Sequence, residues 1–451
     1  MVINTRLLVY IWLPALLFSA CPSEPDGPSG PPPEKVYNAE ILWEREVNIP
    51  RGDYTGTPLI EGPYCYFPAY EYDPGGGPNI VKINMETGKV EWETRRIRDS
   101  STGKPQKIGS HIYLPGESGL IFVYNDSDGK LAATVKLGNY ETEVENNAIG
   151  EYSPVAVSGP YLFWGRSDPR YATRGGLMRF NSRRIDFSRA PGAIQSIAPE
   201  KIWSNSWQAR IYVNLISENG ILYFITSSYT YRYVNEITGE DYMVENPSVL
   251  IALDAETGEV IWEREAPHCR GDDYFELVLN GDKLLVVEET FSSYDKLTGI
   301  PVLENIPPGN KKWYLRGRIT LYNNRLFYLG INEDLVSVND NGNLIWYSSD
   351  KSIVSIDADT GALIWSVFPP QDDDVLFKDF RSSPLGNNGQ VFMLHETGLR
   401  IYNADTGEFM GVDGSFRGGH GWVFSHEIAV YKDAYIFYNW SSNFVTAIRC
   451  K

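Results

Sequence analysis

Short apolar stretches recur along most of the chain with the two-residue alternation that is typical of β-strands with one buried face. The clearest example is the segment 250–265, where Leu-Ile-Ala-Leu precedes Asp254-Ala-Glu-Thr-Gly258 and Val-Ile-Trp follows it. Asp254 can accept hydrogen bonds from the turn backbone, and Gly258 can adopt a positive φ without a steric cost. The segment therefore predicts a β-hairpin with a tight corner and a second strand that ends in tryptophan.

This hairpin pattern is repeated. In three copies a tryptophan stands four residues after the corner glycine: Gly88 and Trp92, Gly258 and Trp262, and Gly361 and Trp365. Weaker copies without the tryptophan surround Gly129, Gly299 and Gly407, and a degenerate copy is expected near 179–187. Corners that lie roughly 40–60 residues apart indicate a propeller or a solenoid. Because two further short strands precede each corner, the unit is predicted to be a four-stranded antiparallel propeller blade.

The two ends of the globular region complement each other. The segment 443–449 resembles a third blade strand and has no fourth strand after it, whereas 39–47 resembles the fourth strand at 259–266. A closed ring leaves no long unpaired edge, so the two ends are expected to share one blade. The corners and this composite blade predict an all-β, eight-bladed propeller. Segments 229–247 and 333–351 are predicted hairpin insertions between the second and third strands of their blades, on one rim of the ring.

The repeated Asp-x-x-Thr-Gly-x-x-x-Trp pattern resembles that of the PQQ-like repeat propellers, and the resemblance covers most of 37–451. This family includes quinoprotein dehydrogenases and the propeller lipoprotein of the outer-membrane β-barrel assembly machine. The resemblance implies that a quinone enzyme of this fold has a disulfide between adjacent cysteines and a Ca²⁺ site. This sequence has no Cys-Cys pair and no Cys-x-x-Cys-His haem motif. We therefore expect no quinone cofactor, no metal and no catalysis.

The N-terminal segment indicates export. Residues 1–20 contain Arg6 and an apolar run that fits a signal peptide, and they end in small residues before Cys21. This arrangement resembles a bacterial lipobox, so Cys21 is predicted to be lipidated, with an ordinary signal peptide as the alternative. Residues 21–36 are rich in proline, serine and glycine and predict a disordered tether before the propeller at 37–451. The residue after the cysteine is Pro22 and not the aspartate that resembles an inner-membrane retention signal, so the outer membrane is favoured. The formal charge of −18 argues against a nucleic-acid partner.

Two groups of residues are candidates for binding. The loop Arg417-Gly-Gly-His420-Gly-Trp422 combines charge, a titratable ring and a stacking face, with a tight inter-blade loop as the alternative. Trp203 and Trp207, together with three tyrosines in 229–233, could bind sugars or a partner, with strand packing as the alternative. Trp92, Trp262 and Trp365 are predicted to pack between blades.

The sequence thus predicts a non-catalytic, lipid-anchored envelope propeller that binds a protein partner. The resemblance suggests outer-membrane protein assembly as the nearest concrete role. A glycan-binding or small-ligand-binding surface lipoprotein is the alternative, and a quinone-dependent dehydrogenase is a more remote one.

Overall fold

The computed structural model describes the β-rich part of the chain. The described residues are 40–46, 58–68, 80–94, 104–115, 120–137, 155–166, 176–203, 215–226, 229–234, 241–246, 248–266, 276–315, 318–335, 337–338, 344–345, 351–368, 383–395, 398–413, 429–432, 434–439 and 444–449. Val36–Lys451 forms one compact unit, and all the described strands belong to it. That unit is the predicted propeller.

Seven blades are each built from one continuous stretch of chain. We number them I to VII and list their strands from the inside of the ring outward. Blade I contains β2 (Leu59–Glu61), β3 (Tyr64–Pro68), β4 (Ile80–Asn84) and β5 (Val90–Glu93), and blade II contains β6 (Gln106–Ile108), β7 (His111–Pro115), β8 (Leu120–Asn125) and β9 (Leu131–Leu137). Blade III contains β10 (Val155–Ser158), β11 (Tyr161–Arg166), β12 (Gly176–Asn181) and β14 (Glu200–Trp203).

The remaining blades follow the same strand order. Blade IV contains β15 (Ile216–Glu218), β16 (Ile221–Ile225), β19 (Val249–Asp254) and β20 (Val260–Glu265), and blade V contains β21 (Glu276–Asn280), β22 (Lys283–Val287), β23 (Phe291–Asp295) and β24 (Pro301–Ile306). Blade VI contains β26 (Thr320–Tyr322), β27 (Arg325–Asn332), β30 (Lys351–Asp357) and β31 (Leu363–Val367), with β25 (Trp313–Leu315) also paired to β27. Blade VII contains β32 (Leu385–Asn387), β33 (Gln390–His395), β34 (Gly398–Asn403) and β35 (Phe409–Asp413).

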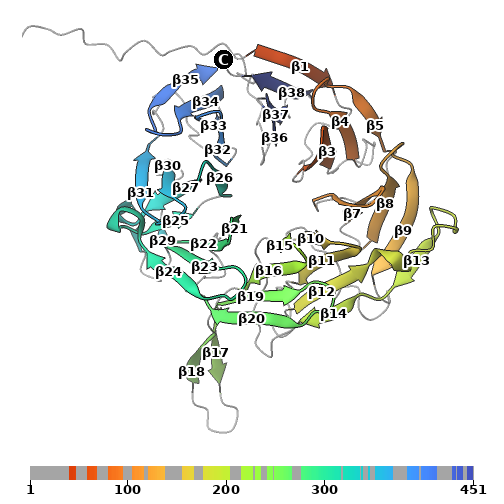
Figure 1. Ribbon diagram of the computed structural model, residues 1–451, viewed down its shortest axis with the longest axis horizontal. Helices are drawn as coiled ribbons and strands as arrows, with labels where there is room; N and C mark the ends of the chain where they lie inside the picture. Colours follow the sequence, from red (N-terminus) through yellow and green to blue (C-terminus); the bar gives the residue numbers. More distant parts are fainter. Residues whose placement is uncertain are drawn as a thin grey trace, which may run out of the picture. The chain divides into compact units, whose positions relative to one another are not determined.

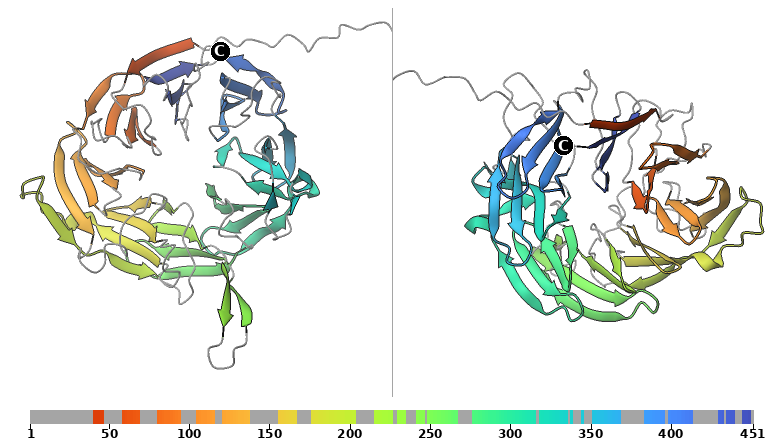
Figure 2. Two further views of the ribbon diagram at one scale, coloured as in Figure 1. Left: turned by 180° about the vertical axis from the view of Figure 1, so that it is seen from behind. Right: turned by 45° about the horizontal axis from the view of Figure 1, so that its top comes forward.

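One further sheet joins the two ends of the propeller. It consists of β36 (Ala429–Tyr431), β37 (Ala434–Asn439), β38 (Phe444–Arg449) and, on the outside, β1 (Glu40–Glu46). The pairing of β1 with β38 is antiparallel and runs from Glu40 opposite Arg449 to Glu46 opposite Phe444. Figures 1 and 2 show these two strands side by side. The predicted closure is therefore confirmed, and the count of eight is reached only when this closing sheet is included beside the seven continuous blades.

The corners have the predicted chemistry. In blade IV the Asp254 carboxylate accepts hydrogen bonds from the backbone N–H groups of Glu256 (2.9 Å) and Thr257 (2.6 Å). Gly258 has a φ of +78°, the left-handed conformation that glycine adopts without strain. Each of the corners that follow β4, β19, β23, β30 and β34 uses an aspartate or asparagine in this way. The corner backbone also donates to the turn between the first two strands, for example from Met85 N to Pro63 O. Corners and inner turns therefore lie on one face of the ring, which we call the corner face.

Tryptophans from the outer strands lock neighbouring blades together. The indole of Trp262 in blade IV contacts Gly299 at the corner of blade V, and its Nε1 donates to the Lys296 carbonyl (3.0 Å). The predicted inter-blade packing is confirmed for all three repeat tryptophans, and Trp43 on β1 makes the same contact with blade I. The contacts are Trp43 on Gly88, Trp92 on Gly129, Trp262 on Gly299 and Trp365 on Gly407.

A β-bulge aims these side chains at the next blade. The register of the pairing between the third and fourth strands shifts immediately before the tryptophan, for example between the partners of Ala252 and Leu253 in blade IV. The same shift precedes Trp92, Trp365 and Trp43. A bulge adds one unpaired residue and increases the local twist, which turns the next side chain out of the plane of its own sheet. Corner, bulge and tryptophan thus work as one unit.

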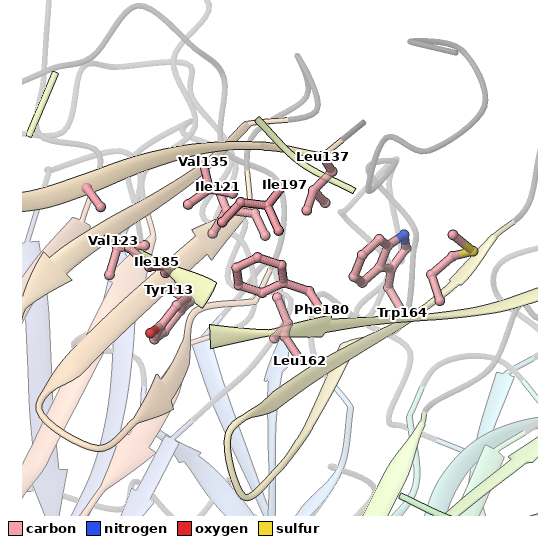
Figure 3. Packing of buried hydrophobic residues seen from close by; sticks show 12 residues of the cluster. Tyr113, Ile121, Val123, Val135, Leu137, Leu162, Trp164, Phe180, Ile185 and Ile197 are labelled. Carbon is pink, nitrogen blue, oxygen red and sulfur yellow. The ribbon is translucent and has the colours of Figure 1, made fainter. Parts of the chain in front are cut away.

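The contact between blades II and III is made differently. The degenerate corner expected near 179–187 is a 3-10 helix, Ser182–Arg184, and Ile185 stands where other corners have glycine. The outer strand of blade II has Ala133 in place of the tryptophan, and Ala133 and Ile185 belong to one buried cluster. Figure 3 shows Ile185 among the apolar side chains of this cluster. A large corner residue thus faces a small strand residue. The following strand β13 (Ile194–Ile197), which the sequence pattern did not predict, pairs in parallel with β9 on the outer edge of blade II.

Both predicted insertions are hairpins. In blade IV, β17 (Tyr229–Val234) pairs with β18 (Asp241–Asn246) as a separate two-stranded sheet. In blade VI, a 3-10 helix (Glu333–Leu335) precedes the short pair β28 (Ser337–Val338) and β29 (Leu344–Ile345). Each insertion connects the second strand of its blade to the third, so both begin at the face opposite the corner face. A further 3-10 helix, Pro308–Asn310, follows β24.

The contribution of the tryptophan–glycine contact to stability can be tested by replacing the glycine with alanine, which adds one methyl group. At Gly299 a Cβ would lie 2.6 Å from the Trp262 ring, so Gly299→Ala must displace the indole as well as strain a backbone with a φ of +67°. We expect the free energy of unfolding to fall by roughly 3 kcal/mol, the sum of backbone strain and overpacking. Urea denaturation followed by tryptophan fluorescence measures this change.

Gly281 in the same blade is the matched control, because it has a φ of +61° and nothing within 4 Å of an added Cβ. Gly281→Ala introduces backbone strain without a steric clash, so the free energy of unfolding is expected to fall by about 1 kcal/mol. Equal losses for the two variants would contradict the role assigned to the indole contact.

Candidate functional site

Most of the predicted site residues lie outside the described part of the chain. The loop at 417–422 and the proposed lipidation site belong to segments that the structure does not describe, as does the second tryptophan of the 203–207 pair. These residues are Cys21, Trp207, Arg417, His420 and Trp422. Their roles stay predictions. The three tyrosines of 229–233 lie in β17.

Trp203 is the predicted site residue that the structure places. It ends β14 and is half-buried, and its ring meets Phe224 of blade IV edge-on at a centroid distance of 5.2 Å. Both rings belong to one apolar cluster between blades III and IV. The geometry is that of strand packing, the alternative given above, and a role in ligand binding stays a prediction.

A dense polar cluster joins blades I and II around Asp126. One carboxylate oxygen of Asp126 accepts from Lys82 Nζ (2.6 Å) and from the Tyr66 hydroxyl (2.6 Å), and the other lies 3.0 Å from Lys107 Nζ. Asp126 is the second residue of the corner that receives Trp92, after Asn125, and its backbone carbonyl accepts from Trp92 Nε1 (2.8 Å). The cluster is therefore fixed by the same corner that locks the two blades.

Aromatic rings surround the buried lysine of this cluster. Lys82 is 6% exposed, and its Nζ lies 4.1 Å from the ring centroid of Tyr64 and 5.3 Å from that of Tyr66. An ammonium group over an aromatic face gains electrostatic stabilisation that increases as water is excluded. The negative faces of the rings and the Asp126 carboxylate together offset the cost of burying the charge.

Ionisation in the cluster follows from these contacts. Burial by itself would raise the pKa of Asp126, but hydrogen bonds from Lys82, Tyr66 and Lys107 outweigh it and lower the pKa of the carboxyl. Burial raises the pKa of Tyr66, and the hydrogen bond that it donates to Asp126 raises it further. The lowered pKa keeps Asp126 ionised at neutral pH, and the raised pKa keeps Tyr66 a neutral phenol. Each group donates to or accepts from a neighbour, which suits a structural lock.

Other charged groups on the corner face also connect neighbouring blades. Lys432 of the closing sheet pairs with Glu86 of blade I (2.5 Å), and Tyr431 donates to the same carboxylate (2.9 Å). The Lys432 hydrogen bond, followed by that from Tyr431, lowers the pKa of Glu86. Further bridges join blade V to blade VI and blade VI to blade VII. They are Lys283 with Asp359 and Arg325 with Asp405.

Sequence reasoning missed these bridges, although part of the signal was visible. The second residue after the corner aspartate or asparagine is acidic in several repeats, at Glu86, Asp359 and Asp405. Their partners come from the blades before them at positions without a fixed spacing. Only the ring geometry brings each pair together.

The described residues offer no constellation for metal or thiol chemistry. Within them no group of three or more His, Cys, Asp or Glu side chains is arranged to hold a metal ion. Cys65 is a free thiol, and complete burial raises its pKa. Across the same residues, no helix has the length and apolar character needed to span a membrane.

Comparisons with known proteins agree with this architecture. Residues 192–442 match the model of a family described as "Outer membrane protein assembly factor BamB". These residues extend from blade III to the closing sheet. No curated protein matches the sequence.

Several solved structures share the fold at low sequence identity. Quinohemoprotein alcohol dehydrogenase ADHIIG from Pseudomonas putida HK5 is 12% identical, with a TM-score of 0.56 over 91% of this chain and 76% of that one. The computationally designed Ika8 protein is 10% identical, with a TM-score of 0.54 over 90% of this chain and 100% of the design. BamB from Moraxella catarrhalis is 12% identical, with a TM-score of 0.40 over 92% and 98% of the two chains. At these identities the first two structures show the fold alone.

The lock between blades I and II predicts a specific response to acid. The contacts that lower the pKa of Asp126 stabilise the fold above the unfolded-state pKa near 3.8, and this contribution is lost as the pH falls through the lower folded-state value. Asp126→Asn leaves Lys82 without its carboxylate, so the free energy of unfolding at pH 7 is expected to fall by roughly 2 kcal/mol. Urea denaturation at a series of pH values measures both effects.

Asp128→Asn is the control, because Asp128 lies in the same corner and its ion pair is with the exposed Lys130 side chain. Little change in stability is expected. The structural role of Asp126 is contradicted if wild type and Asp126→Asn differ in free energy of unfolding by the same amount at pH 7 and at pH 3.

Proposed function

This chain belongs to the outer membrane protein assembly factor BamB family, and we propose that it is a non-catalytic scaffold that binds protein partners during outer-membrane protein assembly. The single observation that carries the proposal is the family match, which spans residues 192–442. The proposal concerns a protein-binding role and assigns no reaction to any residue.

The architecture supports a scaffold because it holds its surfaces in fixed positions. Tryptophan–glycine contacts and inter-blade ion pairs connect neighbouring blades, and the β1–β38 ladder joins the two ends. A ring tied in this way presents its loops with little loss of conformational freedom on binding, which favours affinity. The insertions on the face opposite the corners supply surface beyond the basic blade.

The envelope location is supported by the family and by the N-terminal sequence. We propose that residues 1–20 direct export, that Cys21 carries the lipid, and that 21–36 tether the propeller to the outer membrane. One acyl chain gives only marginal membrane binding, so anchoring needs the several chains that a lipidated cysteine carries. Glycan binding through Trp203 and the loop at 417–422 is the alternative that the experiment below must separate.

Lipidation can be tested on the full chain. Cys21→Ser is expected to move the protein from the membrane fraction to the soluble fraction and to abolish labelling by an alkyne fatty acid. Cys65→Ser is the control, because Cys65 is a buried thiol within blade I and lies outside the leader. An unchanged membrane fraction and unchanged labelling of Cys21→Ser would contradict the anchor.

The scaffold role is tested by purifying the tagged full-length protein from cross-linked envelopes. We expect components of the outer-membrane barrel-assembly machinery to be recovered in near-stoichiometric amounts. Cells that carry the same tag on an unrelated lipoprotein provide the control. Recovery of a polysaccharide-uptake partner instead, or glycan binding that is lost in Trp203→Ala, would reject the scaffold in favour of the alternative.

A further inference from the structure

The outward-facing residue at the β-bulge of each blade follows a pattern along the ring. This residue precedes the tryptophan position and is set off by the register shift between the third and fourth strands. In blades IV, V and VI it is a β-branched apolar residue and is exposed: Ile261 at 46%, Val302 at 51% and Ile364 at 37%. In blades I and II the same position holds Glu91 and Ala132, which are only partly exposed.

Neighbouring apolar residues enlarge this surface on blades IV and V. Val260 beside Ile261 is 45% exposed, and Ile300 and Leu297 at the corner of blade V are 56% and 58% exposed. We call Val260, Ile261, Leu297, Ile300 and Val302 the apolar wall. The two blades meet here, because the Trp262 ring contacts Gly299. Exposed apolar residues that gather on one surface mark interaction sites more often than scattered single ones do.

The charge around the apolar wall is predominantly negative. The exposed charged residues of β20 and of the residue before it are Glu259, Glu263, Arg264 and Glu265, and β24 adds Glu304. Four carboxylates thus surround the wall against one guanidinium. An anionic membrane surface would be repelled by this charge, whereas a segment with basic side chains beside apolar ones would be attracted.

The ring already shows how an outer edge can accept a strand. On blade II, β13 pairs in parallel with the outer strand β9, with Ile194 opposite Thr134 and Ile197 opposite Leu137. Within the described residues no strand pairs with the outer edge of β20 or of β24. Unpaired edge groups are a template for an added strand, with side-chain contacts giving specificity.

We propose that the apolar wall of blades IV and V binds an extended polypeptide segment that carries alternating apolar and basic side chains. The segment pairs with an outer strand edge as β13 does on blade II. Its apolar residues cover Ile261 and Val302, and its basic residues face the surrounding carboxylates. This inference rests on the proposed scaffold role in so far as the partner is a protein, and it names the surface that the partner uses.

The probe is a fluorescein-labelled decapeptide of alternating lysine and valine, titrated with the purified propeller while fluorescence anisotropy is recorded. The double variant Ile261→Ser/Val302→Ser removes the centre of the wall without touching the buried seam. We expect it to weaken binding at least tenfold. Affinity for the wild type is expected to fall as salt rises, because the attraction of the exposed carboxylates is screened.

Ile41→Ser is the matched control. Strand β1 reads Glu-Ile-Leu-Trp-Glu-Arg-Glu and β20 reads Val-Ile-Trp-Glu-Arg-Glu after Glu259, and Ile41 is 51% exposed. Ile41 occupies the place that Val260 has in blade IV, beside the bulge residue Leu42. Among the described residues of the closing sheet no other large apolar side chain is exposed, so wild-type affinity is expected. Equal weakening in Ile41→Ser, or none in the double variant, would overturn the proposal. So would equally tight binding of a glutamate–valine peptide.

Two other occupants of the wall give distinct results. Concentration-dependent dimers in sedimentation velocity that the double variant abolishes would assign the wall to a second copy of this chain and overturn the proposal. Binding to vesicles of anionic lipid that the same variant abolishes would assign it to the membrane, with the same consequence. Failure of the scaffold role is detected in a different experiment: the wild-type protein purified from cross-linked envelopes would then carry no barrel-assembly components.

Discussion

The fold depends on one contact that is repeated around the ring: an indole from an outer strand lying on a corner glycine of the next blade. The contact needs a glycine with a positive φ, a bulge that turns the tryptophan, and a carbonyl that accepts from Nε1. Each blade is a small sheet that cannot bury its apolar faces alone, so it depends on packing against its neighbours. The contact fixes the distance and the angle between neighbouring blades, and these two quantities determine the circumference of the ring.

Much of this could be read from the sequence because the contact has a fixed local spacing. Trp262 stands four residues after Gly258, and the copies at Gly88 and Gly361 share that interval, so the blades and their corners could be predicted. Strand β13 could not, because its parallel pairing with β9 joins two blades and leaves no periodic trace. The lock around Asp126 was missed for the same reason, since Lys82 and Lys107 come from different blades.

The exceptions show how the constraint can be met in other ways. Between blades II and III the small residue is on the strand, Ala133, and the large residue is at the corner, Ile185. The outer strand of blade VII has Gly411 at the tryptophan position, and the closing sheet that follows has no corner to receive an indole, because its fourth strand comes from the N-terminal end. The seam is preserved by matching volumes, so a residue must be judged with its partner in the next blade.

The ladder between β1 and β38 has a consequence for how the protein is made. Its partners are far apart in the chain: the Glu44 carboxylate accepts from the Thr446 hydroxyl across 402 positions. Such distant pairs are the slowest to meet during folding. The first strand must therefore wait for the last one to emerge, and the backbone edge that pairs with β38 stays without that partner in the meantime. A nascent chain that stalls before residue 444 cannot complete the circle, which makes late truncation as damaging to this molecule as early truncation.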